Sequence, residues 1–532
     1  MLQQAGFSPP REDNLHRCQD TAAAASYRIY NRGDSMKMTT SLIARRTLIS
    51  CLLAASIGSL SVPASAGAKT YGGGAPANSS ALPAGDFRTA LEALPASQHE
   101  RAMQWLQSVE FTEHDLEHLR VDKQGSIYYA DTFATDKKPS GDKQQQIGTT
   151  SGINEKNILK LHSRPGAANT IFVDFDGATI SETAWNSNAG VRSWKARPYD
   201  ADNNPQSFNA EEVSAMADIW RRIAEDFAPF NVDITTEDPG RTRANTAWVL
   251  VTHSEQRSTQ PLPNPESSSV AYMNILGFSH TGYYSPAMVY YNNLEATDLI
   301  AGAVSHNVGH MLGLSHDTPA TSGKSGDQGL VSWAPVMGLD HRKHVTQWSN
   351  GDYPGAVNTQ NDVGILIGAF DLRGDDHADS RFDRGTPLVA DGSGRIVSST
   401  PATDPENRHK ENKGLIEDSE DIDVFVFDAG SGTVDITVTP AWVDSGQVAH
   451  RGANLDVHVA LFNAAGKKVA ENDPRNDTSS NLKTRVSPGR YKLEIQGVGN
   501  AAGPYSSYGS IGQYYISGSV PPTKTTLAKS NR

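Results

Sequence analysis

Two stretches of the chain, 86–119 and 208–230, place apolar residues three and four positions apart. This spacing is typical of amphipathic helices, which bury one stripe of side chains. Pro229 ends the second pattern, as proline does when a helix stops. A third helix is predicted over 297–312, where two histidines lie four residues apart.

Short apolar runs predict strands around these helices. A strand is expected within 125–131, and others within 170–180, 231–237, 246–254, 267–275 and 286–293. Strands that alternate with two long helices favour an α/β layer rather than a β-sandwich. Residues 166–372 are therefore expected to form one domain, in which helices pack on a mixed sheet.

The pattern changes after Leu372. Residues 373–415 are polar and rich in Asp, Gly, Ser and Pro, which predicts a linker or long loops. Short alternating runs then follow in 422–429, 433–441, 454–470, 489–498 and 512–520. They predict an antiparallel β-sandwich over 416–520 and a disordered tail over 521–532.

Composition narrows the class of protein. The chain has 532 residues, a net charge of −13 and a hydrophobic fraction of 37%, with a mean hydropathy of −0.48. This polarity argues against stable membrane insertion. The absence of a long Lys/Arg-rich run argues against nucleic acid as a partner. Nothing in the sequence indicates an oligomeric state.

The N-terminus has the pattern of an export signal. Lys37, Arg45 and Arg46 precede an apolar run at 48–60, and small residues follow at 64–66. This order is typical of a secretory signal peptide, and it predicts a secreted or periplasmic protein. The arginine pair also permits a twin-arginine signal, but general secretion fits better.

Cleavage of the leader, 1–66, is expected before Gly67, and translation could begin at Met36 or Met38. Both cysteines precede that cut, so the exported protein would have neither a disulfide nor a cysteine ligand. Residues 67–165 are expected to form a helical pro-segment. A small N-terminal accessory region is the alternative.

The segment AVSHNVGHMLGLSHD, 303–317, carries candidate metal chemistry. His306 and His310 lie one turn apart on the same helix face, so both can reach one ion. Gly313 suits a left-handed turn at the helix end, and that turn could bring His316 to the same point. Three imidazoles with a fourth position left for water or substrate describe a catalytic zinc site.

This spacing resembles the zinc motif of the metzincin endopeptidases. The matching residues are His306, His310, Gly313, His316 and Asp317. APVMG, 334–338, looks like the methionine turn of these enzymes, which implies that Met337 lies below the metal. The resemblance implies hydrolysis of protein or peptide substrates, with Asp317 in a structural role beside the third ligand.

The resemblance extends beyond the motif. Residues 170–371 look like a bacterial, reprolysin-like branch of the metzincins, and 417–520 resemble the bacterial pre-peptidase C-terminal domain. The implied architecture is a helical pro-segment, a metzincin-like zincin domain of α+β type and a C-terminal antiparallel β-sandwich.

Asn307 departs from the family pattern. The resembling enzymes have a glutamate there, which accepts a proton from zinc-bound water. An amide cannot do so near neutral pH, so activity is predicted to be lost or strongly impaired. Three interpretations stay open: a natural pseudoprotease, a protease that uses another base, and a substituted residue in an otherwise active enzyme.

Two other functions compete with hydrolysis. A zinc-bearing pseudoprotease could bind peptides as a decoy or inhibitor, and the C-terminal sandwich could act as a surface-binding module. Calcium is a second candidate cofactor, because carboxylates in turns are its usual ligands. The candidates are Asp174, Asp176, Asp421, Asp423 and Asp456, and ordinary turn carboxylates are the alternative.

Overall fold

The structure is a computed structural model. It describes residues 69–133, 152–240, 244–256, 260–277, 279–319, 331–339, 343–378, 385–400, 403–404, 407–441, 453–501, 503 and 505–523. The described residues belong to one compact unit. The predicted leader and most of the predicted tail lie outside them. None of the described helices is long and apolar enough to cross a membrane.

A seven-stranded mixed sheet lies at the centre of the part of the chain that carries the three histidines. Its order is β3-β4-β10-β11-β9-β5-β8. The strands span Leu119–Val121, Ile127–Asp131, Ser269–Tyr272, Ala287–Tyr290, Thr246–Thr252, Asn169–Asp174 and Val232–Thr235, in that order. Strands β11, β9, β5 and β8 are parallel, whereas β3, β4 and β10 each run antiparallel to the strand that follows in this order. Their near-continuous apolar sequences fit a sheet that is buried on both faces.

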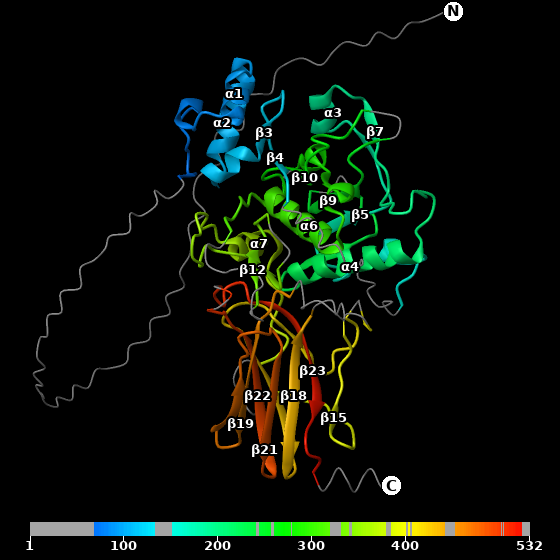
Figure 1. The fold of residues 1–532 in the computed structure, drawn as a ribbon, viewed down its shortest axis with the longest axis vertical. Helices are drawn as coiled ribbons and strands as arrows, with labels where there is room; N and C mark the ends of the chain where they lie inside the picture. Colours follow the sequence, from blue (N-terminus) through cyan, green and yellow to red (C-terminus); the bar gives the residue numbers. More distant parts are fainter. Residues whose placement is uncertain are drawn as a thin grey trace, which may run out of the picture. The chain divides into compact units, whose positions relative to one another are not determined.

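Two long helices pack together against this sheet (Figure 1). Helix α4 spans Ala210–Asp226 and begins at a capping box, in which the Asn209 side chain accepts hydrogen bonds from the Glu211 and Glu212 amides. Helix α6 spans Thr297–Leu312, as predicted from the histidine spacing. It contacts β9, β10 and β11, so these strands lie beside the helix that carries the histidines.

The N-terminal segment, defined here as residues 69–133, forms its own small core and also extends the central sheet. Helices α1, Asp86–Glu92, and α2, Ala96–Gln107, pack around Leu91, Leu106 and Phe111. Strand β4 then pairs with β10 in register, with Asp131 opposite Ser269. The helical prediction for this segment is confirmed, and its last strand belongs to the sheet of the next domain.

Shorter elements complete this part of the chain. They are β1 Thr70–Tyr71, β2 Phe111–Thr112, β6 Thr179–Ser181, α3 Ala184–Ala189, β7 Ser193–Lys195, α5 Tyr291–Leu294, β12 Trp333–Pro335, β13 Val345–Gln347 and α7 Asp362–Phe370. The short 3-10 helices are Ser79–Ala81, Glu113–Glu117, Ile158–Lys160 and Thr281–Tyr284.

The C-terminal region consists of two five-stranded sheets. One has the order β14-β17-β22-β19-β20, and the other joins β15, β23, β18 and β21, with β16 also paired to β23. The strands are β14 Thr386–Pro387, β15 Arg395–Ile396, β16 Lys413–Ile416, β17 Ile422–Ala429, β18 Gly432–Pro440, β19 Val457–Asn463, β20 Lys468–Asn472, β21 Ser480–Val486, β22 Gly489–Gly497 and β23 Gly512–Ser519.

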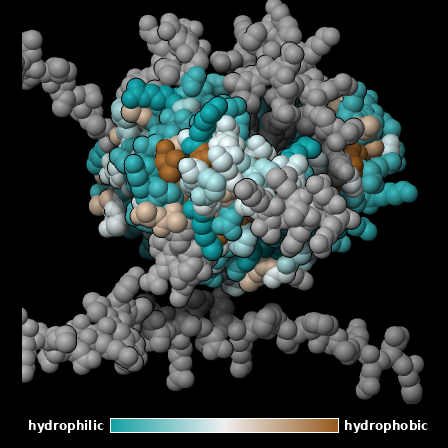
Figure 2. Space-filling model, turned by 90° about the horizontal axis from the view of Figure 1, so that it is seen from below, coloured by the Kyte–Doolittle hydropathy of each residue, from teal (hydrophilic) through white to brown (hydrophobic). Residues whose placement is uncertain are grey.

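Residues 373–415 differ from the predicted linker, because β14 and β15 lie within them and join the C-terminal sheets. Both strands have only two residues, which explains why the polar composition gave no strand pattern. On the face drawn in Figure 2, the described surface is mainly hydrophilic with scattered hydrophobic residues. Exposed hydrophobic residues of this kind are normal for a soluble domain.

Candidate metal centre

Helix α6 brings His306 and His310 onto one buried face. Both side chains are fully buried. The helix ends at Gly313, whose φ of 95° is left-handed, and the Leu314 amide then donates to the Gly309 carbonyl. This turn returns the chain toward the helix, so that His316 reaches the other two rings. The predicted glycine turn is confirmed.

One nitrogen of each ring is held by an acceptor. His306 Nδ1 lies 2.9 Å from the Val336 carbonyl, and His310 Nδ1 lies 2.8 Å from the Leu314 carbonyl. A carbonyl can only accept, so these Nδ1 atoms carry the proton and each Nε2 keeps a lone pair. His316 Nδ1 faces a carboxylate, Asp115 Oδ1, at 3.2 Å.

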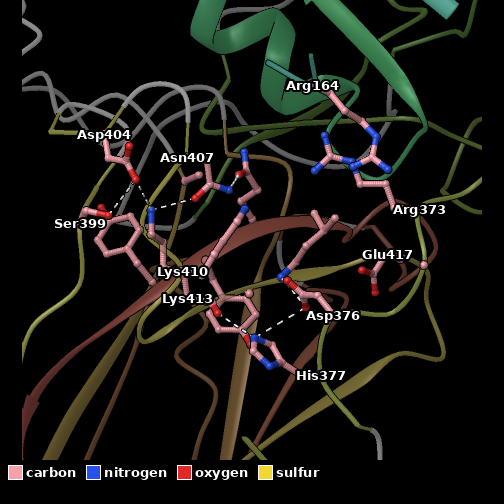
Figure 3. A pocket seen from close by; sticks show the side chains of 17 residues that line it. Arg164, Arg373, Asp376, His377, Ser399, Asp404, Asn407, Lys410, Lys413 and Glu417 are labelled. Carbon is pink, nitrogen blue, oxygen red and sulfur yellow. Dashed lines mark hydrogen bonds and ion pairs between the residues drawn. The ribbon is translucent and has the colours of Figure 1, made fainter. Parts of the chain in front are cut away.

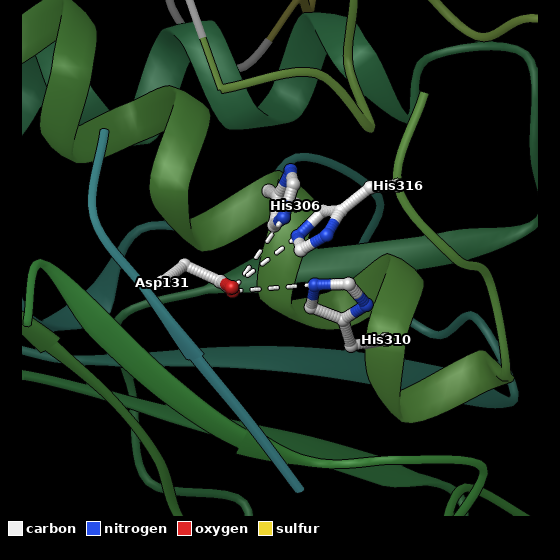
Figure 4. A group of neighbouring side chains, drawn as sticks. All are labelled: Asp131, His306, His310 and His316. Carbon is white, nitrogen blue, oxygen red and sulfur yellow. Dashed lines mark ion pairs between the residues drawn. The ribbon is translucent and has the colours of Figure 1, made fainter. Parts of the chain in front are cut away.

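The three Nε2 atoms converge on Asp131, at the end of β4 (Figure 4). Asp131 Oδ2 is 3.6 Å from His306 Nε2 and 3.3 Å from His310 Nε2, and Asp131 Oδ1 is 3.2 Å from His316 Nε2. Both Asp131 oxygens are buried and make no hydrogen bond within the described residues. No local pattern in the sequence pointed to this carboxylate.

These distances fit ligand atoms that share one ion better than they fit hydrogen bonds. Tetrahedral zinc with bonds of about 2.0–2.1 Å places its ligand atoms roughly 3.3–3.4 Å apart. The oxygen-to-nitrogen distances of 3.2–3.6 Å bracket this value. Three nitrogens and one carboxylate are also a usual zinc ligand set.

One residue of β4 and one residue just beyond its end cover the histidines. Tyr129 stacks on His310 with a ring separation of 3.6 Å, and Phe133 meets His306 edge-on at 5.1 Å. Side chains two residues apart on a strand share a face, so Asp131 points in the same direction between them. The aromatic rings therefore leave the carboxylate as the polar group that β4 presents to the site.

Asp115, also from the N-terminal segment, supports His316. Its Oδ2 accepts hydrogen bonds from the Thr112 amide and hydroxyl at 2.7 and 2.8 Å. Its Oδ1 accepts from the Tyr129 hydroxyl and the His316 amide, both at 2.9 Å. A carboxylate fixed in this way orients the imidazole that faces it.

The electrostatics of the cluster favour a cation. Burial opposes ionisation of Asp131, but the surrounding imidazoles outweigh it and hold its pKa well below the usual range. Burial and the neighbouring His310 lower the pKa of His306 to about 4. Burial acts in the same direction on His316, but Asp131 and Asp115 raise its pKa to about 10. Two buried carboxylates thus face the His316 ring, and Asp131 also lies 3.4 Å from His118 Nδ1.

Asn307 belongs to helix α6, and Met337 packs against the same helix. The Asn307 side chain is fully buried, and neither its oxygen nor its nitrogen has a hydrogen-bond partner among the described residues. Met337 packs against Gly309 so closely that an added Cβ there would overlap its sulfur. Met337 therefore lies against α6 between the turns that carry His306 and His310.

Asp317 does not join the ligand group. Its amide donates to the Met337 carbonyl at 2.9 Å, which connects the third histidine to the methionine turn. Burial and the nearby Asp115 raise the pKa of Asp317 to about 8, and Asp362 has a raised pKa for similar reasons. The side chain is 5% exposed, in agreement with a structural role.

Other acidic groups lie outside the histidine cluster. Within the described residues, three further sets have metal-compatible spacing: Asp376, His377 and Asp423; Asp375, Glu417 and Asp421; and Asp200, Asp202 and Glu212. Two of the calcium candidates, Asp421 and Asp423, fall in such sets. Asp174 instead accepts the Trp248 ring N–H at 2.9 Å, and Asp456 accepts the Tyr505 hydroxyl at 2.7 Å.

A cavity of about 350 Å³ lies beside these C-terminal carboxylates (Figure 3). Its lining mixes cations and anions: Arg164, Arg373, Lys410, Lys413, Asp376, Asp404 and Glu417. Lys413 already pairs with Asp404 at 3.0 Å. Because charges of both signs line this cavity, its composition does not select a ligand class.

Comparisons with known proteins inform the C-terminal region alone. No protein-family model and no curated protein matches the chain. Among solved structures, the pre-peptidase C-terminal domain of a collagenase from Bacillus anthracis is similar, with 19% identity and a TM-score of 0.15. The match covers 20% of this chain and 83% of that one. The described fold is mixed and sheet-rich on the evidence of its own strand pairing.

Proposed function

We propose that the chain is a zinc hydrolase of the metzincin endopeptidase type whose activity on protein substrates is strongly impaired. The observation that carries the proposal is the convergence of three buried Nε2 atoms, two of them fixed by backbone carbonyls. Zinc held there would polarise a peptide carbonyl and lower the pKa of bound water. The resemblance of the His-Gly-His spacing to metzincins supports the same assignment.

The position of β10 beside the histidine-bearing helix supports a peptide substrate. Strand β10 lies next to α6, and β4 pairs with it antiparallel. Extended peptides bind in this manner by adding a strand to a sheet edge. A substrate paired with β10 would pass directly over the histidines, as β4 does.

Asn307 accounts for the expected impairment. A glutamate at this helix position would act as the proton acceptor, whereas the amide has no accessible proton affinity near neutral pH. General acid–base catalysis typically contributes about 10²–10⁴-fold, and the loss should be at least that large. The buried amide without a partner also supports the second candidate, a peptide-binding pseudoprotease.

The experiment compares the native protein with Asn307→Glu and Asn307→Gln. Zinc per chain and casein cleavage are measured for each, using protein from which residues 69–133 have been cut and removed, because β4 covers the site. We expect one zinc in all three proteins and cleavage in Asn307→Glu alone. The glutamine variant controls for side-chain length without adding a base.

Each other result has a defined meaning. Chelator-sensitive cleavage by the native protein would show that another base operates, and the impairment would be wrong. Zinc in all three proteins with no cleavage by Asn307→Glu would favour the peptide-binding pseudoprotease. No zinc in any of them would refute the metal assignment.

A further inference from the structure

Three carboxylates gather at the start of helix α4, away from the histidine cluster. Asp200 and Asp202 belong to the loop before this helix, and Glu212 lies in its first turn. One oxygen of each side chain lies within 4.8 Å of an oxygen of the other two. Oxygens that bind one calcium ion at about 2.4 Å can lie at most about 4.8 Å apart. The spacing therefore allows all three side chains to bind the same ion.

Amide groups hold two of these carboxylates in place. Glu212 Oε1 accepts a hydrogen bond from the Ala201 amide at 2.7 Å, and its Oε2 accepts from the Asn209 amide at 2.9 Å. Asp202 Oδ1 accepts from the Asn204 amide at 2.8 Å, and its Oδ2 accepts from the Asn209 side chain at 2.9 Å. A carboxylate oxygen has a further lone pair, so these bonds orient both groups and leave them able to bind a cation.

Asp200 differs from the other two carboxylates, because it is both buried and incompletely paired. The residue is 6% exposed, and its Oδ1 has no hydrogen-bond partner among the described residues. Its Oδ2 pairs with Arg197 at 3.2 Å. One guanidinium beside three carboxylates leaves an excess of negative charge. A buried carboxylate oxygen without a partner is costly unless a cation compensates it.

The loop sequence DADNN, 200–204, places side-chain oxygens at alternate positions. Calcium loops of the EF-hand type begin in this manner and take a further glutamate from the end of the loop, where the next helix begins. The loop departs from that type at Pro205, where an EF-hand has glycine, and Glu212 comes one position later than the EF-hand glutamate. The likeness is therefore one of ligand chemistry.

We propose that Asp200, Asp202 and Glu212 bind one calcium ion. Calcium takes roughly six to eight oxygen ligands, so loop carbonyls and water would complete its coordination. Asp202 is exposed, which gives the ion access from solvent. No atom of the histidine cluster takes part, so the inference goes beyond the proposed function and does not depend on it.

The bound ion would fasten the loop to elements that support the histidine-bearing helix. The Tyr291 hydroxyl donates to the Asp200 carbonyl at 3.0 Å, and Tyr291 begins α5, which contacts α6. Glu212 belongs to α4, which also packs against α6. Calcium should therefore make local opening of residues 200–212 rarer.

Hydrogen exchange of the full chain tests this locally. Exchange of the amides at 201–212 is followed by mass spectrometry with calcium at about ten times its Kd, with magnesium at the same concentration, and with chelator. The native protein, Asp200→Asn and Glu211→Gln are compared. Glu211 is an exposed carboxylate beside Glu212, so its amide variant is a matched control. Because the measurement is confined to this loop, calcium bound by the C-terminal carboxylates does not contribute to it.

We expect calcium to slow this exchange by about tenfold in the native protein and in Glu211→Gln, and not in Asp200→Asn. No slowing in the native protein, or equal slowing in all three proteins, would overturn the site. Slowing by magnesium as strong as that by calcium would overturn the assignment to calcium. If Asp200→Asn does not fold, Asp202→Asn, at an exposed position, replaces it, and full slowing in that variant would equally overturn the site.

Discussion

The N-terminal segment and the C-terminal region both contact the part of the chain that carries the three histidines. They contact different groups within it. The N-terminal segment places Asp131 and Asp115 against the imidazole rings themselves. The C-terminal region contacts the end of α4, where Asn454 donates to Asp226 at 3.1 Å and Gln513 donates to Glu225 at 2.8 Å.

Asp226 connects this second interface to α6. Its Oδ2 accepts a hydrogen bond from Ser305, the residue before the first histidine, at 2.5 Å. The C-terminal region thus supports the backbone that carries the site, and the N-terminal segment contacts the atoms that would bind metal. The comparison predicts that changes at the first interface alter metal chemistry and that changes at the second alter stability.

Metal binding should give the largest effect. A ligand that binds only the folded state at a thousand times its Kd stabilises the protein by about 4 kcal/mol. We expect zinc to raise the free energy of unfolding of the full chain by about this amount and chelation to reverse it. Calorimetry of His310→Ala should show no response to zinc, whereas His114→Ala, an exposed histidine, should respond fully. An equal response of both variants would contradict the site.

The sequence predicted those residues of this centre that lie close to one another along the chain. His306, His310, Gly313 and His316 lie within eleven residues, so helix geometry and one glycine turn were enough to bring them together. The run before Asp131 predicted a strand, but no local pattern specifies which strand it pairs with. Its partner, β10, lies more than a hundred residues away, and tertiary pairing decides where the carboxylate points.

The fold shows the same limit at the C-terminal boundary. Most of the longer strands were predicted because their side chains alternate between a buried and an exposed face, but β21, Ser480–Val486, was missed. Strands β14 and β15 were hidden within a polar stretch, since two residues cannot show a periodicity. Their place in the sheets comes from pairing with β17 and β23.

Asp226→Ala should have the next largest effect, on stability. The substitution removes the acceptor for both Ser305 and Asn454, and a buried polar group left unpaired costs about 1–3 kcal/mol. We expect chemical denaturation to show a loss of this size, with zinc affinity changed less than in Asp131→Asn. Asp428→Ala, at an exposed position of β17, is the control and should be neutral. A loss of zinc binding as large as that in Asp131→Asn would remove the distinction between the two interfaces.

The C-terminal interface should also depend on pH through Glu225. Burial raises the pKa of Glu225 to about 8, with a smaller contribution from Asp226, while the hydrogen bonds from Gln513 and the charge of Arg373 act in the opposite direction. Because the folded-state pKa exceeds the unfolded value of about 4.3, this group stabilises the fold at low pH, and its contribution is lost as the pH rises through 8.

Unfolding of the native protein and Glu225→Gln is therefore compared from pH 5 to 8, with chelator present. We expect the stability of the native protein to decline more steeply with pH, because both proteins share every other titrating group. Parallel curves would show that Glu225 has no raised pKa in the folded protein.

Calcium at Glu417 should have the smallest effect and should act on the C-terminal region alone. Burial and the neighbouring Asp421 raise the pKa of Glu417 to about 10, and neither Glu417 oxygen has a hydrogen-bond partner among the described residues. A divalent cation would offset this crowding of carboxylates.

At ten times its Kd, calcium would add about 1.4 kcal/mol to stability. Calorimetry with and without calcium, on proteins that all carry Asp200→Asn, should show this gain in the otherwise native chain and in Glu420→Gln, an exposed control, but not in Glu417→Gln. Zinc affinity should not change when calcium is added, because the two groups of ligands belong to different regions. A change would mean that the C-terminal region acts on the metal centre directly.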